Sequence, residues 1–449
     1  MKIYDNNSKY IVKIARNLKI LLIIVAHLTM TLLRNSEAEL LTLKDCIQLA
    51  AKNSRILKII QHEEAIAEND TFFARSKMLP DVNANLSYTS LAHQPAAIFG
   101  IQTVPLSEKN YFSYSLSIQQ ILYDFRENAA RYGASKAILN TKKLDTERVR
   151  NIVLLDVIIL YFDLLEAEKL LSVAQKEVDR FETHLIDARN LYEAGVITKN
   201  DLLQAEVKIS DAKQKLLSAK NYRELIVSRL NNAILRPLTA EIEVTDNYGV
   251  TSDTLEIDTE FAWGKAEKNR LELAIIDETL KSLDFEQKAK RSEYFPHFFA
   301  RGGYDYTENR YQVHEGNWSL LLGMGINLFQ GGSTRAELLK IENQKLKLKE
   351  QRNKLIDEIR LEVKKYLLDI RNAKERVTVT KDSVLQAEEN LRINKLKYEE
   401  GIGTATDVVD AVTLLTIAET NYYRALYDMR RAEASLLYSM GINLLEVYQ

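Results

Sequence analysis

A short glycine-containing segment occurs twice in this chain, and no other feature constrains the fold more. Residues 192–205 read YEAGVITKNDLLQA and residues 398–411 read YEEGIGTATDVVDA, an offset of 206 in a chain of 449 residues. A repeat spaced by nearly half the chain indicates that one supersecondary unit has been duplicated. Six positions are identical in the two copies: Tyr192, Glu193, Gly195, Thr198, Asp201 and Ala205 recur as Tyr398, Glu399, Gly401, Thr404, Asp407 and Ala411.

A heptad pattern leads into each copy with the same offset. Apolar residues recur every seven positions from Val157 to Tyr192, and again from Val363 to Tyr398. This pattern predicts a long coiled-coil helix in each half, from about residue 125 to 195 and from about 331 to 401. At 1.5 Å per residue, each helix is a rod of roughly 105 Å. The glycine in each repeated segment permits a positive φ, so each helix is expected to end there and the chain to return.

Two segments before each long helix alternate between apolar and polar residues. They cover residues 82–88 and 112–119 in the first half, and 298–306 and 319–328 in the second. Alternation predicts half-buried strands, either of a soluble sheet or of a membrane barrel with lipid outside and water inside. Each half therefore reads helix, strand, loop, strand, long helix, turn and returning helix.

This order divides the chain into two structural repeats, residues 39–236 and 261–449. Residues 237–260 break the helical pattern and are expected to form an irregular equatorial linker around the outside of the coil. Four strands are too few for a membrane barrel, which needs about eight or more. An open sheet in lipid would leave its edges unpaired. Three chains sharing one barrel give twelve strands, which favours a homotrimer with pseudo-sixfold packing.

The N-terminal residues 1–38 are interpreted as a signal peptide. A basic region precedes the apolar run from Ile20 to Leu33, and the small residues Ser36 and Ala38 follow. A tethered N-terminal helix is the alternative. The single cysteine, Cys46, makes an intramolecular disulfide impossible. It is interpreted as a small apolar residue of the first mature helix.

Several functional classes find no support in the sequence. The formal net charge of −2 gives no electrostatic footprint for nucleic acid. No phosphate loop, metal-ligand spacing or nucleophile constellation is present, so we expect neither an enzyme nor a cofactor. A soluble coiled-coil scaffold remains an alternative, and extraction of membranes with sodium carbonate would distinguish it from a barrel.

The two turns, the Ser and Pro residues that start the strands, and LFQGG after the last strand resemble the TolC-like outer-membrane efflux proteins. The resemblance extends from LTLKDCIQLA to SMGIN. It implies a mostly α fold with a small β part. Four strands per chain join a shared 12-stranded outer-membrane β-barrel, which a periplasmic α-helical coiled-coil barrel continues. Asp124-Phe125 departs from the pattern, standing where the second half has Gly331-Gly332, and Gly403 replaces an Arg that links neighbouring helices in other members.

The resemblance implies a passive exit duct for a tripartite efflux pump or, as the alternative, for type I protein secretion. Its partners are a periplasmic adaptor protein, an inner-membrane transporter and outer-membrane lipid. Asp201 and Asp407 are also suited to N-capping the returning helices. The resemblance places aperture aspartates at Asp407 and Asp410, whose rings in a trimer would bind polyvalent cations, whereas Gln204 is the counterpart of Asp410. The predicted aperture comprises Asp407, Asp410, Tyr398 and Asp201, and the predicted adaptor-docking turns comprise Gly195, Val196, Thr198, Gly401, Ile402 and Thr404.

Overall fold

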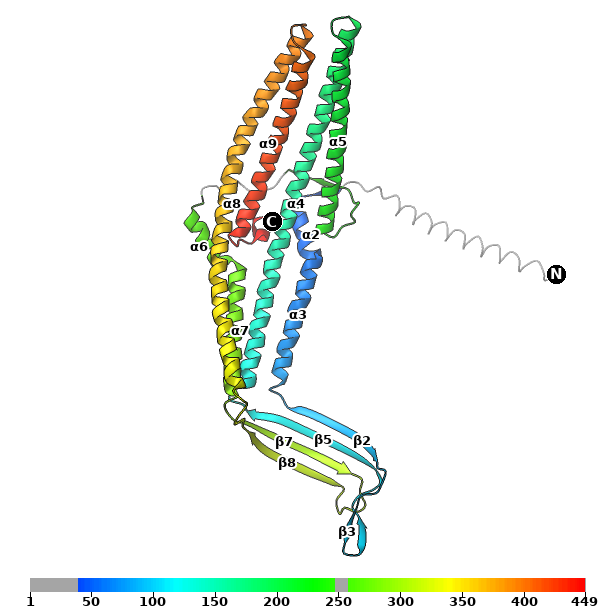
Figure 1. Ribbon diagram of the computed structural model, residues 1–449, viewed down its shortest axis with the longest axis vertical. Helices are drawn as coiled ribbons and strands as arrows, with labels where there is room; N and C mark the ends of the chain where they lie inside the picture. Colours follow the sequence, from blue (N-terminus) through cyan, green and yellow to red (C-terminus); the bar gives the residue numbers. More distant parts are fainter. Residues whose placement is uncertain (1–38, 247–256, 449) are drawn as a thin grey trace, which may run out of the picture.

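The chain is elongated, with helical hairpins at one end and a curved sheet at the other (Figure 1). The computed structural model describes residues 39–246 and 257–448, so the predicted signal peptide lies outside the described residues. The first half contains α2 (Leu43–Asn53), α3 (Arg55–Ser76), β2 (Asp81–Ser90), β5 (Asn110–Tyr123), α4 (Glu127–Glu193) and α5 (Lys199–Ala233). The second half contains α6 (Thr259–Asn269), α7 (Leu271–Ser292), β7 (His297–Thr307), β8 (Gly316–Gly325), α8 (Ser333–Glu399) and α9 (Ala405–Ser439).

Corresponding helices of the two halves are equal in length. The first helices, α2 and α6, have 11 residues each, and α3 and α7 have 22 each. The long helices α4 and α8 have 67 residues each, and the returning helices α5 and α9 have 35 each. The predicted order of elements is therefore confirmed in both halves.

Each helical hairpin reverses at the repeated glycine. Gly195 and Gly401 both have a φ of 73°. The next amide bonds back across the helix end: Val196 N–H donates to the Leu191 carbonyl at 2.8 Å, and Ile402 N–H to the Lys397 carbonyl at 3.0 Å. A left-handed residue at this place lets the last carbonyls of a helix find donors while the chain turns. The turn chemistry read from the sequence therefore produces the two tips.

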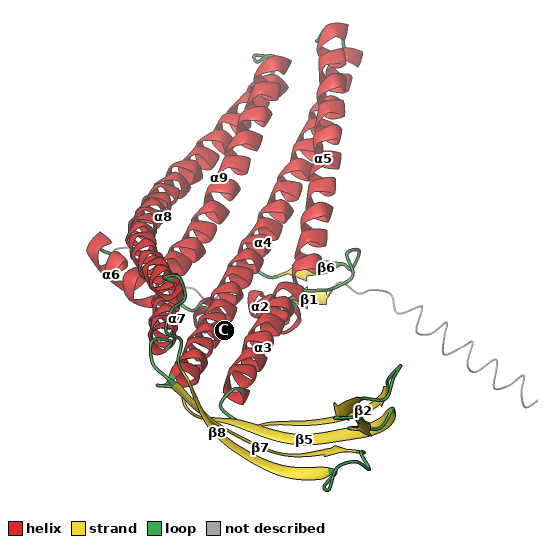
Figure 2. Cartoon of the chain, turned by 60° about the horizontal axis from the view of Figure 1, so that its bottom comes forward, coloured by secondary structure: helices red, strands yellow, loops and turns green. Residues whose placement is uncertain are grey.

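The four main strands form one antiparallel sheet in the order β2-β5-β7-β8. Their register aligns the predicted alternation across the sheet, since Ala84 faces Leu116, Leu116 faces Tyr304 and Tyr304 faces Trp318. One face is therefore apolar, whereas serines and asparagines cover the other. Figure 2 shows the curvature of this sheet. The last strand ends at Gly325, so the predicted extension through Leu328 is wrong.

Some short elements escaped prediction. A hairpin of β3 (Ala96–Phe99) and β4 (Gln102–Pro105) lies within the loop between β2 and β5. The predicted irregular linker contains β6 (Ile242–Val244), which pairs in parallel with β1 (Glu39–Leu41). The helix α6 begins at Thr259, inside the predicted linker. A final short helix, α10, covers Leu444–Val447.

The main apolar core lies where β1, β6, α6 and α10 surround the middle of α4. Tyr161 and Phe162 of α4 and Tyr427 of α9 are among its largest buried side chains. The Tyr161 hydroxyl donates to the Thr245 carbonyl at 2.7 Å, which ties the residues after β6 to the helices. The core therefore joins both halves at the level of the linker.

The start of each long helix is a pair of left-handed residues. In the second half these are Gly331 and Gly332, with φ of 61° and 83°. In the first half they are Phe125 and Arg126, with φ of 51° and 69°. The structure thus corrects the sequence comparison by one residue, because Phe125-Arg126, not Asp124-Phe125, corresponds to the glycine pair. None of the helices in the described ranges combines the length and apolar character needed to cross a membrane.

Candidate functional site

The tips of the two hairpins hold most of the predicted site residues, and both returning helices begin with a capping box. In the second tip, Asp407 accepts hydrogen bonds from the Thr404 backbone N–H at 3.0 Å and from its hydroxyl at 2.7 Å. Asp407 N–H in turn donates to the Thr404 hydroxyl at 3.2 Å. Asp201 makes the same bonds with Thr198 in the first tip. The N-cap residues are therefore Thr198 and Thr404, and the two aspartates complete the capping boxes from position N3, so the prediction that the aspartates themselves are the N-caps is wrong.

This hydrogen bonding has an electrostatic consequence at the second tip. The hydroxyl and the backbone N–H of Thr404 lower the pKa of Asp407, and nearby Lys397 adds to the effect. Asp407 is therefore an anion across the ordinary pH range. Both hydrogen bonds from Thr404 go to Oδ2, so one carboxylate oxygen is occupied by the cap.

Asp410 lies one turn further along α9 and differs from Asp407. Its side chain is exposed, and among the described residues it has neither a hydrogen bond nor an ion pair. The corresponding residue of α5, Gln204, is also exposed but uncharged. Asp410 is thus a carboxylate of the second tip that the fold leaves unengaged, as is Glu400 in the turn itself.

Tyr398 lies in the contact surface between the two hairpins, which we call the seam. Its side chain is 3% exposed, whereas Tyr192 at the equivalent position of the first half is 39% exposed. The Tyr398 ring lies 5.3 Å from the imidazole of His184 on α4, centroid to centroid. Of the two equivalent tyrosines, Tyr398 is therefore buried between the hairpins and Tyr192 is exposed on the surface. Tyr398 does not lie on the exposed rim with Asp410.

The predicted docking residues lie at the free ends of the hairpins (Figure 1). Val196 is 60% exposed and Ile402 is 78% exposed, so each tip presents an apolar side chain beside its glycine. Thr198 and Thr404 at these tips are committed to the capping boxes. The surface offered to a partner is consequently small and is similar in the two tips.

Charged pairs hold the seam further from the tips. Arg180 of α4 forms two hydrogen bonds with Glu419 of α9, at 2.8 and 3.0 Å. Arg431 of α9 contacts Asp163 and Glu166 of α4, both at 2.7 Å. Sequence reasoning missed these pairs because the partners are more than 230 residues apart, and no periodic signal links them.

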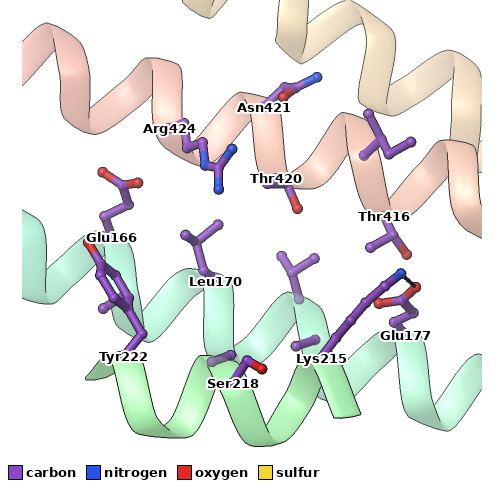
Figure 3. Close-up of a pocket in the computed structure, with 15 residues that line it drawn as sticks. Glu166, Leu170, Glu177, Lys215, Ser218, Tyr222, Thr416, Thr420, Asn421 and Arg424 are labelled. Atoms are coloured by element: carbon purple, nitrogen blue, oxygen red, sulfur yellow. Dashed lines mark hydrogen bonds and ion pairs between the residues drawn. The ribbon is translucent and has the colours of Figure 1, made fainter. Parts of the chain in front are cut away.

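A hollow of about 670 Å³ opens along the seam between α9 and the α4–α5 hairpin (Figure 3). Lys215 of α5 bonds to Glu177 of α4 at 2.7 Å on one wall, and Thr416, Thr420 and Arg424 of α9 stand opposite. Since both hairpins supply the walls, the width of this hollow depends on their spacing. The geometry fits an adjustable seam between two rods better than it fits an enclosed ligand site.

The sheet completes the site. On its polar face, the Ser87 and Ser113 hydroxyls are 2.7 Å apart, and the Asn85 amide donates to the Ser115 hydroxyl at 3.4 Å. Arg301 and Asp305 of β7 share this face, since their register partners include Gln119 and Ser115. The chain thus presents a polar face and an apolar face on one sheet that leads directly into two long helical hairpins.

Comparison with known proteins agrees with this arrangement. The sequence profile described as "Outer membrane efflux protein" matches residues 46–234 and 263–441. The chain belongs to the outer membrane efflux protein family. The two matched ranges correspond to the two halves of the repeat, and the gap between them contains the linker.

Individual relatives are distant in sequence. The alkaline protease secretion protein AprF of Pseudomonas aeruginosa is 21% identical over 344 residues, covering 75% of this chain and 71% of AprF. The outer-membrane channel OprN has a TM-score of 0.78 at 15% identity, covering 90% of each chain. VceC of Vibrio cholerae has a TM-score of 0.78 at 16% identity, covering 89% of this chain and 96% of VceC. These likenesses confirm the fold.

Family membership confirms several predictions from the sequence. The protein is an outer-membrane efflux channel of the TolC type, located in the outer membrane with a periplasmic extension. Channels of this family are not enzymes. The helical hairpins are therefore the periplasmic part, and the sheet is the membrane part.

Proposed function

We propose that three copies of this chain form the outer-membrane exit duct of a tripartite efflux pump. The duct passively conducts small molecules such as drugs and toxic compounds from the periplasm to the exterior. The main support is the continuity of each 67-residue helix with a strand that has one polar and one apolar face. A periplasmic adaptor protein docks on the duct, and an inner-membrane transporter supplies the energy for transport. We also propose that residues 39–236 and 261–449 are the repeats that build one third of the wall, joined by residues 237–260.

The gate of this duct lies at the periplasmic tips, at Asp407, Asp410, Tyr398 and Asp201. Around a threefold axis, Asp410 would form a ring of carboxylates, and such rings attract cations. Asp407 contributes less to cation binding, because its Oδ2 atom already accepts two hydrogen bonds from Thr404. Asp410, which has no partner among the described residues, is therefore the main cation-sensitive group of the gate.

Single-channel conductance in planar bilayers tests the gate. Asp410→Asn should raise conductance and relieve the block by a trivalent cation such as hexamminecobalt. Gln204→Asn, at the matching position of the first tip, is the control and should change neither property. Asp407→Asn should relieve less of the block. If the trivalent cation blocks both aspartate variants as strongly as the wild type, the carboxylate ring is not the cation-binding part of the gate.

Adaptor docking at the tips is tested separately by cysteine crosslinking. The native Cys46 is buried and does not interfere. Val196→Cys and Ile402→Cys should each crosslink to the adaptor in cells with an active pump. Leu361→Cys, exposed on α8 far from the tip, should not. Equal capture at all three positions would rule out tip-specific docking.

Type I protein secretion is the second candidate, favoured by the similarity to AprF, whose name records alkaline protease secretion. The chain should be expressed in a host that lacks its own channel of this family, together with either an efflux adaptor–pump pair or a protease exporter pair. We expect restored ethidium efflux in the first host. Protease in the medium of the second host, without efflux in the first, would favour secretion.

A further inference from the structure

A basic hollow lies where the sheet meets the helices. It has a volume of about 380 Å³ and is formed by α4, α7 and the residues between β5 and α4. We call it the junction hollow. It is lined by Phe125, Arg126, Ala129, Ala130, Phe285, Lys288, Arg291 and Ser292. Three of these eight residues are cations and none is acidic.

The three cations of the junction hollow lack acidic partners. Arg126, Lys288 and Arg291 are exposed, and none forms an ion pair with another described residue. The contrast with nearby cations is direct, because Arg131 pairs with Glu127 at 2.9 Å and Lys290 pairs with Glu293 at 2.8 Å. Three like charges around one hollow repel each other, and an anion placed between them would remove this repulsion.

Two residues that line or adjoin the junction hollow have a strained backbone conformation. Phe125 and Arg126 have positive φ, which costs a residue with a side chain roughly 1–2 kcal/mol compared with glycine. The second half uses Gly331 and Gly332 at these positions. Lys288 is not duplicated either, since Phe72 stands at the equivalent position of the first half, although Arg291 does recur there as Arg75. Strain retained in one half alone suggests that its side chains have a use.

Aromatic residues connect the junction hollow to the apolar face of the sheet. Tyr123 is in register with Phe298, which faces Met324 on that apolar face. The Tyr123 ring lies 4.9 Å from the Phe125 ring, which stacks on Phe295 at 4.7 Å. The hollow therefore opens where the apolar membrane face ends and the periplasmic helices begin. Aromatic rings and long cationic side chains are enriched at this level of membrane proteins, where headgroups lie.

We propose that the junction hollow binds the phosphate group of a phospholipid in the periplasmic leaflet of the outer membrane. Arg126, Lys288 and Arg291 surround the phosphate, and arginine forks suit its paired oxygens. The Phe125 and Phe285 rings contact the glycerol and the first acyl carbons. The Lys288 ammonium already lies over the Phe285 ring, 5.1 Å from its centroid, so a cation and an aromatic ring share one wall. Bound lipid would fix the level of the channel in the membrane.

Binding to the purified, full-length channel in detergent tests this proposal. Short-chain phosphatidylglycerol, short-chain phosphatidylethanolamine and inorganic phosphate are titrated separately, and bound lipid is counted by native mass spectrometry. Loss of one charge-assisted contact should weaken phosphatidylglycerol binding by about tenfold in Arg126→Gly and in Lys288→Ala. Inorganic phosphate should not compete at concentrations that match the lipid. Competition by phosphate at equal concentration would show a site for soluble anions and would overturn the lipid assignment.

The repeat itself supplies the variant that keeps the fold intact. Arg126→Gly copies Gly332 and relieves the left-handed backbone, so the variant should melt at the same or a higher temperature. Arg131→Gln is the matched control, since Arg131 is at the same level of α4 but lines a different hollow and is paired with Glu127. Wild-type lipid binding by Arg126→Gly, or an equal loss in Arg131→Gln, would overturn the proposal.

Discussion

The ring of Tyr398 on α8 lies 5.3 Å from the imidazole of His184 on α4, and both side chains are buried. Neither the Tyr398 hydroxyl nor the His184 Nε2 has a hydrogen-bond partner among the described residues. Near their tips the two hairpins are thus joined by apolar packing, to which Leu191 of α4 and Val408 of α9 also contribute. Buried polar atoms without partners cost free energy, so this contact is easier to open than the charged pairs further along the seam.

Changes at Tyr398 should separate ring packing from hydroxyl chemistry. Tyr398→Phe removes an unpaired buried hydroxyl, so stability should be unchanged or slightly higher. Tyr398→Ala should destabilise the folded channel by about 3 kcal/mol, because it leaves a cavity in the seam. Tyr192→Ala, at the exposed counterpart, should change the unfolding midpoint little. Melting temperatures of the purified variants measure these differences, and a large loss in Tyr398→Phe would contradict this account.

The seam should weaken as the pH falls. Burial lowers the pKa of His184, and Lys395 lowers it further, while Asp187 opposes both. A folded pKa below the ordinary value means that the unfolded state binds the proton more readily. The stability contributed by neutral His184 is therefore complete above about pH 6.5. It is lost as the pH falls through the lower folded value.

Thermal melting at a series of pH values checks this dependence. The wild-type midpoint should fall between pH 7.5 and pH 5.5, and His184→Phe should fall less over the same interval because it has no proton to bind. Asp179→Asn, at an exposed carboxylate on the same helix, serves as the control for general charge effects. Parallel wild-type and His184→Phe curves would rule out His184 as the titrating group.

Arg431 should contribute more to the free energy of unfolding than an exposed arginine does. Its side chain is 21% exposed and contacts Asp163, Glu166 and Asp428. Burial raises the pKa of Glu166, and Arg431 counteracts this. Arg431→Met leaves Glu166 without its partner and should cost about 3 kcal/mol.

A second arginine gives the matched control for Arg431. Arg376 pairs with Asp428 at 3.2 Å, but its side chain is 49% exposed. Arg376→Met should cost less than about 1 kcal/mol, because solvent screens such pairs. Urea unfolding followed by circular dichroism measures both variants. Equal losses would show that burial does not set the strength of these pairs.

Replacing the turn glycine by alanine should destabilise the protein by the same amount in both halves. Gly195→Ala and Gly401→Ala each place a side chain at a φ of 73°, where nothing else lies within 4 Å of the added carbon. Backbone strain is then the main cost, about 1–2 kcal/mol in each variant. Gly264→Ala in α6 also meets no neighbour but has no positive φ. That variant should be neutral or slightly stabilising, and the melting temperatures of all three provide the comparison.

Local signals were sufficient for the main strands and the long helices. The alternation in residues 112–119 predicts a strand, and the heptads from Val157 onward predict a helix, because period 2 and period 3.5 are visible in neighbouring residues. The hairpin β3–β4 was missed because its residues lie in a mixed, polar loop without regular alternation. The pairing of β1 with β6 was missed for another reason, since two three-residue strands whose paired residues are 203 positions apart give no local signal.

The candidate site was predictable only in part. Asp407 and Thr404 share a turn, so their capping box follows from spacing along the chain. The burial of Tyr398 and the exposure of Tyr192 do not follow, because the two residues stand in almost identical sequences. Which of them is buried depends on the surface that the other hairpin presents.

The sequence by itself determined the duplicated hairpins, the reversing glycines, the two faces of the sheet and the family. These features depend on residues close together in the chain or on a repeat of known offset. Some differences between the halves, such as Asp410 against Gln204, are visible in the sequence, but only the tertiary structure decided which residues of the two halves meet. Tyr398 meets His184, Arg431 meets Glu166, and Arg126 joins Lys288 only when distant helices pack side by side. Duplication repeats the same local sequence signals in both halves, whereas packing places different neighbours around the equivalent residues.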